Sequence, residues 1–214
     1  MSIATRDATA AAVTDEQLAE LARFGVATLY EASGLDCALD PAIRPVWRGP
    51  RIAGRALPVR THPADNLPMH LAVERAQPGD LLIVDGREEI CGYWGEVLAV
   101  AAQQRGIVGL VMDGGVRDTA EQEQLGFPVW ARGIGVRRTG KFWPGLVGEP
   151  ITVAGVPVRP GDAVVADADG VLVLPAEAVE ATLAASQQRI DKEDGIMSRI
   201  RAGETTMDIY GFRR

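Results

Sequence analysis

The chain has 214 residues and is 47% hydrophobic, so it is long and apolar enough to bury the core of a single domain. Its formal net charge of −7 argues against direct binding of nucleic acid, because such binding relies on clustered Lys and Arg that neutralise phosphates. No stretch of about 18 apolar residues is present, and the sequence therefore predicts no membrane-spanning helix.

The first residues do not resemble a secretory signal, because Asp7 interrupts their mildly apolar portion. We expect residues 1–13 to be disordered. Cys37 and Cys91 are far apart in the sequence and form no CxxC motif, so they are expected to be free thiols. Together these features predict a cytoplasmic protein.

Two short helices are predicted to lead the fold. The segment TDEQLAELARFG (14–25) has a capping threonine, an amphipathic pattern and a final glycine, and VATLYEASG (26–34) ends in the same way. Residues 35–50 contain two prolines and a Gly-Pro step, which predict a loop, and residues 51–62 predict a strand region.

A parallel β-α-β unit is predicted in the middle of the chain. The apolar run LLIVDG (81–86) follows a Pro-Gly-Asp turn and predicts a buried strand, as does IVGLVMDGG (107–115). Between them, apolar residues in CGYWGEVLAVAAQQRG (91–106) recur at helical spacing until the final glycine. Such units collect their ligands beyond the carboxyl ends of the strands.

Charged residues follow both of these strands. Glu96 lies beside Gly95 near the start of the helix, and after a gap of twenty residues the pair Arg117-Asp118 follows the second strand. Two carboxylates and a guanidinium around one concave spot suit a divalent metal ion and a small keto acid. Two structural alternatives stay open: Glu96 complements the helix dipole, and Asp118 caps the next helix in a capping box with Glu121.

The rest of the chain predicts strands and a long final helix. Residues 127–174 are rich in β-type segments, and the sequence Asp-Ala-Asp-Gly at 167–170 predicts a hairpin turn. Residues 175–203 predict a helix with one apolar side, punctuated by Gly195 and followed by a more exposed tail. Because a helix of this length at the end of a modest domain often packs on a neighbouring subunit, we expect a homo-oligomer.

The region around these motifs resembles the RraA-like family. The resemblance runs from about Thr14 to Tyr210, and it rests on the combination of an acidic residue, a twenty-residue gap and an Arg-Asp pair. These lie in GYWGEVLAVAAQQRGIVGLVMDGGVRDTAEQEQLGFPVWARG (92–133), with PGDLLIVDG before it and VRPGDAVVADADGVLVLP (158–175) after it. The family includes metal-dependent 4-hydroxy-4-methyl-2-oxoglutarate aldolases, which also decarboxylate oxaloacetate, and proteins named as regulators of RNase E.

The resemblance implies how the chain is organised. The implied fold is α/β: a layered β/β/α fold of the swivelling-domain type, with a central sheet, N-terminal helices and a C-terminal helix. A single catalytic domain is implied over residues 14–190. Residues 191–214 would form a C-terminal helix and tail at a subunit interface of a homotrimer or homohexamer.

The resemblance also assigns roles to individual residues. Arg117 would clamp the substrate carboxylate, Asp118 would bind Mg²⁺ or Mn²⁺, and the substrate would also be held by the segment Gly95, Glu96, Val97 and Leu98 through its backbone amides. Family members often have Asp at the position of Glu96, so this chain keeps the charge on a longer side chain.

Two carboxylates are further candidates for the chemistry. Glu96, acting through a water molecule, is the candidate general base. In the family a glutamate near the C-terminal helix can reach the site of a neighbouring subunit, and by its approximate position Glu193 in IDKEDG (190–195) is the candidate here.

The implied function is that of a metal-dependent lyase that releases pyruvate from 4-hydroxy-4-methyl-2-oxoglutarate and decarboxylates oxaloacetate. Both reactions pass through a pyruvate enolate, whose developing negative charge a divalent cation stabilises as a Lewis acid. Two alternatives remain. One is a protein-binding regulator of RNase E, which needs a partner surface but not an intact site, and the other is an enzyme that acts on another small acid.

Overall fold

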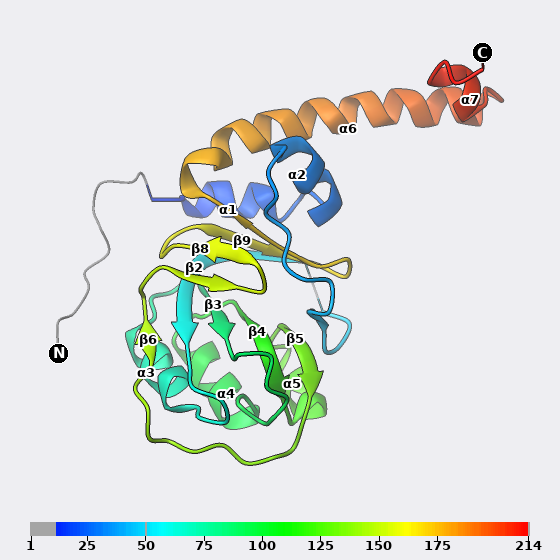
Figure 1. Ribbon diagram of the computed structural model, residues 1–214. Coiled ribbons are helices and arrows are strands. Elements are labelled where there is room, and N and C mark those ends of the chain that lie inside the picture. Colours follow the sequence, from blue (N-terminus) through cyan, green and yellow to red (C-terminus); the bar gives the residue numbers. More distant parts are fainter. Residues whose placement is uncertain (1–11, 50, 214) are drawn as a thin grey trace.

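The computed structural model describes residues 12–49 and 51–213 (Figure 1). Most of the N-terminal stretch that we expected to be disordered lies outside these residues, while Val13, at its end, is buried with 2% of its surface exposed. The described part is a mixed α/β structure with a curled central sheet and surrounding helices, which confirms the expected fold class.

The two N-terminal helices form where the sequence predicts them. α1 (Asp15–Leu21) begins at a capping box, in which the Thr14 hydroxyl accepts the Gln17 N–H and the Gln17 side chain accepts the Thr14 N–H. α2 (Val26–Ser33) ends at Gly34, whose left-handed conformation (φ 64°) is open to glycine without steric cost.

The central sheet joins eight strands. The path across it is β1-β5-β4-β3-β2-β9-β10, and β6 also pairs with β2. The strands from β2 to β5 run parallel to one another, and the others are antiparallel to their partners. Their bounds are β1 Arg44–Pro45, β2 Ile52–Arg60, β3 Asp80–Asp85, β4 Gly109–Val116, β5 Val129–Ile134, β6 Leu146–Val147, β9 Ala163–Ala166 and β10 Val171–Leu174.

The predicted β-α-β unit is confirmed. β3 and β4 are adjacent and parallel, with Asp85 opposite Asp113, and α4 (Glu96–Gln104) connects them. The expectation of a loop over residues 35–50 is wrong in one place, because Arg44–Pro45 forms the edge strand β1, which pairs with β5. This pairing satisfies backbone groups that an open sheet edge would leave without partners.

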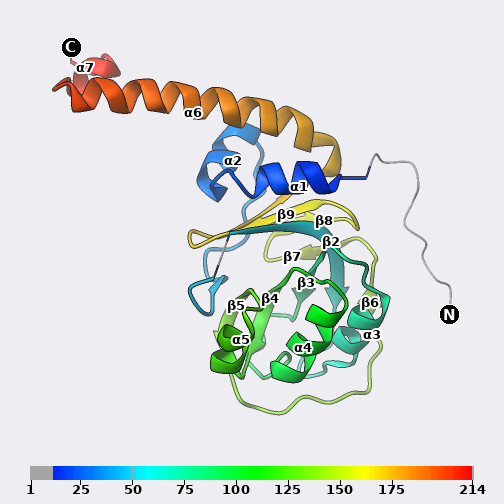
Figure 2. The same ribbon diagram turned by 180° about the vertical axis from the view of Figure 1, so that it is seen from behind.

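Both faces of the sheet are covered. Figure 2 shows α3 (Leu67–Arg75), α4 and α5 (Thr119–Leu125) together on one face, where they pack over an apolar cluster that includes Leu82. The small β7–β8 hairpin packs over the other face, on a cluster that includes Ile83. Alternate residues of β3 therefore face two separate cores, which explains its continuous apolar sequence. The hairpin strands are Ile151–Val153 and Val156–Val158.

The hairpin turn predicted at residues 167–170 is present between β9 and β10. Asp167 closes the turn, because one of its carboxylate oxygens accepts the Asp169 N–H at 2.8 Å. The other oxygen accepts the Val26 N–H, and the carbonyl of Asp167 accepts the indole N–H of Trp130. A single aspartate thus joins the hairpin to α2 and to β5.

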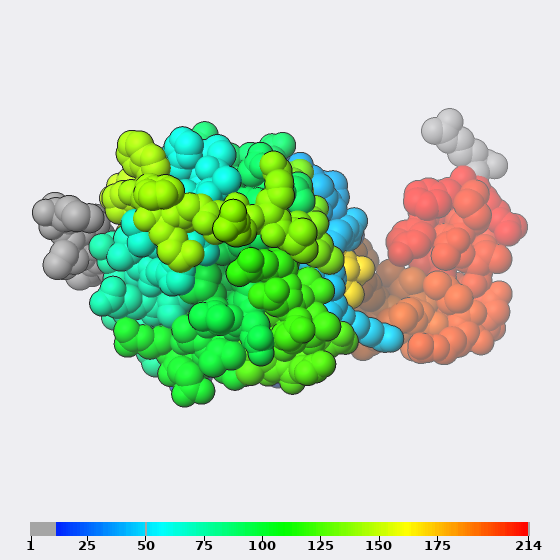
Figure 3. Space-filling view, turned by 90° about the horizontal axis from the view of Figure 1, so that it is seen from below, coloured from blue at the N-terminus to red at the C-terminus, as the bar shows by residue number. Residues whose placement is uncertain are grey.

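The C-terminal helix leaves the body of the molecule. α6 (Val179–Arg201) packs on α2 through its first half and then extends away to α7 (Thr206–Ile209) (Figures 1 and 3). It continues through Gly195, which does not interrupt it, and residue 190, where we expected the catalytic domain to end, lies inside the helix. We call α6, α7 and the residues that follow, 179–213, the arm. Exposed apolar side chains gather toward its end: Met197, Ile200, Met207, Tyr210 and Phe212. Within the described residues, neither α6 nor any other helix is apolar enough over sufficient length to cross a membrane.

The exposed arm predicts that the protein assembles. We expect size-exclusion chromatography with light scattering to give a multiple of the 22.8 kDa chain mass, because assembly would cover these apolar side chains. Replacing both Met197 and Ile200 with Glu is expected to lower the mass of the assembly, whereas Gly195→Ala on the same helix should leave it unchanged. A wild-type mass of one chain would contradict the prediction.

Candidate functional site

Two loops meet beyond the carboxyl ends of β3 and β4. The chain that follows β3 runs alongside the end of β4, where the Gly115 N–H donates to the Glu89 carbonyl at 3.0 Å and the Arg117 N–H donates to the Trp94 carbonyl at 2.8 Å. These hydrogen bonds hold the segment between β3 and α4 against the end of β4. They also place the start of α4 directly beside Asp118.

Glycines allow this close approach. A Cβ atom on Gly115 would overlap the backbone of Cys91, and a Cβ atom on Gly95 would overlap the carboxylate of Asp118 and lie 3.2 Å from Cγ of Arg117. Gly95 has an extended backbone (φ −153°), so its small size and not its conformational freedom is what this position requires.

Asp118 is the N-cap residue of α5, as one alternative from the sequence expected, but its side chain does not cap that helix. It has left-handed backbone angles (φ 54°, ψ 43°), and its side chain makes no hydrogen bond to α5, so the alternative of a capping box with Glu121 is wrong. Its carboxylate oxygen Oδ2 instead accepts the N–H of Glu96, the first residue of α4, at 3.1 Å. The left-handed conformation turns the carboxylate away from its own helix and toward the neighbouring one.

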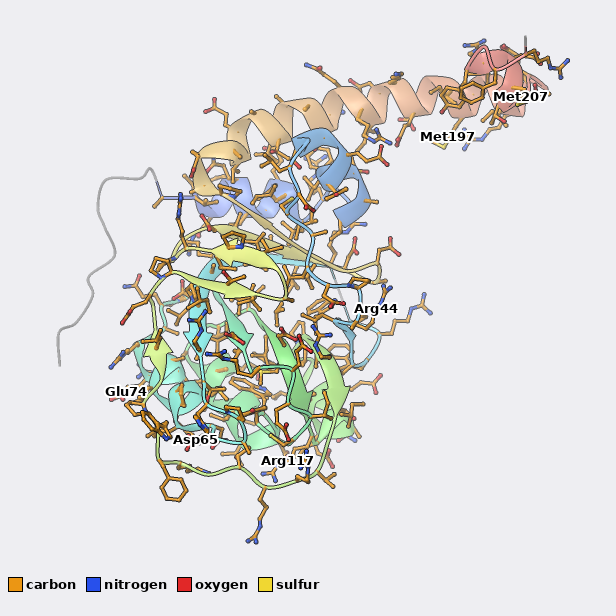
Figure 4. The ribbon with its side chains drawn as sticks, in the orientation of Figure 1. Arg44, Asp65, Glu74, Arg117, Met197 and Met207 are labelled. Atoms are coloured by element: carbon orange, nitrogen blue, oxygen red, sulfur yellow. The ribbon has the colours of Figure 1, made fainter. Side chains whose placement is uncertain are left out.

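Arg117 shares this place with Asp118. Its Nε lies 3.6 Å from Asp118 Oδ2, and the two side chains are 44% and 40% exposed. The aliphatic part of Arg117 passes over Gly92, where a Cβ atom would lie 2.7 Å from Arg117 Cδ. Figure 4 shows Arg117 at the lower edge of the molecule, so its guanidinium is available to an anion from solvent.

The amino end of α4 provides hydrogen-bond donors at the same place. Gly95 is its N-cap and gives no side-chain cap, and the N–H groups of Val97 and Leu98 lie in the first turn, where a helix provides no carbonyl partners. The side chain of Val97 is 79% exposed, while that of Leu98 is buried. Free N–H groups at a helix start favour a negatively charged ligand.

Tyr93 and Trp94 lie beneath the site and do not line its surface. Both side chains are fully buried. The Tyr93 hydroxyl accepts the Ala64 N–H at 2.8 Å and donates to the Gly86 carbonyl, and burial raises the pKa of this phenol. Trp94 stacks on Phe127 with ring centroids 5.8 Å apart. These aromatic residues support the loop that leads to α4.

Glu193 lies far from this place within one chain. It is on the arm, where it pairs with Arg189 at 2.7 Å, while Arg189 also pairs with Glu31 of α2. Figure 4 places Arg117 at the opposite end of the molecule from Met197, which lies one turn beyond Glu193 on α6. Only a neighbouring subunit could bring a Glu193 to the site.

Gln122 lies beneath the site and was not identified from the sequence. It is completely buried on α5, and its side-chain amide donates to the carbonyl of Arg117 at 2.6 Å. Because the sequence of α5, TAEQEQL, is mostly polar, nothing in it indicates that this glutamine is buried and not exposed to solvent.

Comparison with known proteins places the chain in a family. A family model described as Aldolase/RraA matches residues 9–173, most of the chain. The chain belongs to the RraA-like family. This confirms the resemblance drawn from the Glu96 and Arg117-Asp118 motif.

Two relatives that are similar to this chain in sequence are named as aldolases. A Halalkalibacterium halodurans protein is 36% identical over 64% of this chain and 66% of its own length, slightly under two thirds, and a Deinococcus radiodurans protein is 38% identical over 64% and 86%. Both are named "Putative 4-hydroxy-4-methyl-2-oxoglutarate aldolase".

Solved structures of the family share the fold. RraAS2 of Streptomyces coelicolor, described as an unusual member of the RNase ES inhibitor RraA protein family, aligns with a TM-score of 0.78 and 26% identity over 88% of this chain and 98% of its own. The RNA-processing inhibitor RraA of Thermus thermophilis aligns with a TM-score of 0.65 and 31% identity over 71% and 92%.

The close packing at Gly95 predicts that this position does not tolerate a side chain. Gly95→Ala should displace the Asp118 carboxylate, because the added Cβ overlaps it, and the Glu96 N–H should then lose its acceptor. Amide hydrogen exchange at Glu96 should therefore become at least about tenfold faster. Gly195→Ala is the control, since nothing lies within 4 Å of its added Cβ. An equal exchange rate at Glu96 in wild type and Gly95→Ala would contradict the prediction.

Proposed function

We propose that the chain is a metal-dependent class II aldolase that cleaves 4-hydroxy-4-methyl-2-oxoglutarate, or a related 4-hydroxy-2-oxo acid, to pyruvate and that also decarboxylates oxaloacetate. The observation that carries this proposal is the convergence of Asp118, Arg117 and the amino end of α4 at one exposed place. The names of the relatives support a lyase at the level of the family.

The donors at the site suit the pyruvate half of such substrates. The Arg117 guanidinium can hold a carboxylate with two parallel hydrogen bonds, and the first-turn N–H groups of Val97 and Leu98 offer further donors to negative oxygens. Both reactions create negative charge on the enolate oxygen, so donors that are fixed before the reaction lower its barrier. These residues do not determine which group is attached to the pyruvate part of the substrate.

The surroundings of Asp118 fit a divalent cation. Its Oδ2 is engaged by the Glu96 N–H, whereas its Oδ1 accepts no hydrogen bond within the described residues, and the side chain is 40% exposed. No three His, Cys, Asp or Glu side chains gather into a metal cage in residues 12–49 and 51–213. Mg²⁺ and Mn²⁺ suit such a site, since Mg²⁺ often binds one or two carboxylates and keeps several waters. When bound, the cation would supply Lewis-acid stabilisation of the enolate charge.

Two glutamates complete the proposed chemistry. Glu96 is exposed in the first turn of α4, where its carboxylate can take a proton from the substrate's 4-hydroxyl group through a water molecule. Glu193 would come from the arm of a neighbouring subunit in a trimer or hexamer. The exposed apolar end of the arm supports such an assembly.

The proposed location is the cytoplasm. Cys37 and Cys91 are both buried free thiols, as expected from their separation in the sequence, which suits a reducing compartment.

The alternative function is regulation of an RNA-degrading enzyme through protein binding. It is favoured by the descriptions of two solved relatives, one an unusual member of an RNase ES inhibitor family and the other an RNA-processing inhibitor. An Asp118→Ala variant separates the two functions, because it should abolish turnover while a partner surface elsewhere would keep its affinity.

Metal dependence is the first test. Pyruvate release from oxaloacetate and from 4-hydroxy-4-methyl-2-oxoglutarate should stop in EDTA and return with Mg²⁺ or Mn²⁺. Asp118→Asn should lower kcat by about 10²- to 10³-fold, the loss typical of removing one charge-stabilising group. Glu121→Gln, which removes a negative charge from exposed α5 surface, should stay close to wild type. Turnover that persists in EDTA, or an active Asp118→Asn, would refute the metal role.

Arg117 provides an independent test of substrate binding. Arg117→Lys keeps the charge but loses the paired geometry, so the KM for oxaloacetate should rise by about ten- to hundredfold, as expected for hydrogen bonds to a charged group that contribute about 1.5–3 kcal/mol. Arg23→Ala removes an exposed guanidinium from the turn between α1 and α2 and serves as the control. An unchanged KM in Arg117→Lys would exclude the clamp role.

A further inference from the structure

Gln122 donates hydrogen bonds to both charged residues of the candidate site. Its side chain is completely buried, its Nε2 donates to the Arg117 carbonyl at 2.6 Å, and its backbone N–H donates to the Asp118 carbonyl at 3.0 Å. The backbone bond is the first helical bond of α5, so only the side-chain bond depends on the residue being glutamine. The remaining polar atom of the side chain, Oε1, is buried without a partner in the described residues.

Packing alone does not account for a glutamine at this position. A buried amide oxygen without a hydrogen bond costs free energy that an apolar side chain of similar size, such as methionine, would avoid. The position nevertheless has an amide, and the bond that this amide donates goes to the backbone of Arg117. The donated bond is therefore the distinguishing property of the residue.

The backbone that receives this bond has an uncommon conformation. Asp118 has left-handed angles (φ 54°, ψ 43°), which few residues other than glycine adopt, although aspartate tolerates them better than most. The Arg117 carbonyl belongs to the peptide group that precedes Asp118, so fixing this carbonyl restricts rotation about the N–Cα bond of Asp118. The Arg117 N–H is fixed too, by the Trp94 carbonyl.

We propose that Gln122 is a positioning residue for the site. It holds the peptide between Arg117 and Asp118, and so keeps Asp118 in the left-handed conformation from which its carboxylate reaches the Glu96 N–H. The effect on metal binding and turnover rests on the proposed function of Asp118, whereas the effect on backbone geometry does not. Gln122 itself touches neither substrate nor metal.

The test compares two variants that both lose the donated bond. Gln122→Met has a similar size but no N–H donor, and Gln122→Asn keeps the amide on a side chain too short to span the distance. Gln124→Met is the matched control, since it makes the same substitution on the same helix at an exposed position. Urea unfolding identifies the variants that are folded under the assay conditions, and Gln122→Asn takes the place of Gln122→Met if the latter does not fold.

Three measurements are expected to change together in the folded variant. Amide hydrogen exchange at Glu96 should be at least about tenfold faster, because the N–H loses its carboxylate acceptor when Asp118 relaxes. The dissociation constant for Mn²⁺ should rise by about tenfold or more, and kcat/KM for oxaloacetate should fall by about 10²-fold, the loss expected when a catalytic group moves by about 1 Å. Gln124→Met should match wild type in all three.

The results distinguish this inference from the proposed function. If wild type releases no pyruvate, the proposed function fails, while exchange at Glu96 still reports whether Gln122 holds the backbone. A purely structural role would lower the urea midpoint and leave the Glu96 exchange rate and the Mn²⁺ affinity of the folded protein unchanged. A folded Gln122→Met or Gln122→Asn with both values within twofold of wild type would overturn the inference.

Discussion

The hydrogen bond from the Glu96 N–H to the Asp118 carboxylate is the contact on which the rest of the site depends. It joins two loops that leave neighbouring parallel strands, and it sets a negative charge at the amino end of α4, where the helix dipole favours it. Parallel pairing of β3 and β4 brings both loops to one edge of the sheet. The hydrogen bonds between residues 89–94 and the end of β4 then bring the two loops into contact.

Small residues make that contact possible. Gly92, Gly95 and Gly115 each lie where a Cβ atom would overlap a neighbouring chain segment or the side chain of a site residue. The glycines around the site are therefore explained mainly by the space between two closely packed loops. Flexibility is not required of them, and the buried Tyr93 and Trp94 stiffen the same region from behind.

The structural and functional interpretations of Asp118 are compatible. One oxygen of its carboxylate serves α4 as a cap, and the other accepts no hydrogen bond within the described residues. A cap that fixes the carboxylate would also prepare it for the cation that we propose, because the side chain would then lose little freedom on binding. The same reasoning applies to Arg117, whose backbone is held by Trp94 and Gln122 while its guanidinium stays accessible.

The sequence by itself determined the elements and the charged residues at their ends. Helical caps, apolar runs and turn residues act over a few neighbours, so they predicted α1, α2 and the β3-α4-β4 unit, and the spacing of Glu96 from Arg117-Asp118 indicated the family. Only the tertiary structure decided which helix Asp118 caps, that Gln122 is buried, and that α6 leaves the body as a continuous arm. These outcomes depend on contacts between segments distant in the chain, which can select a left-handed backbone or bury a polar side chain against its local preference.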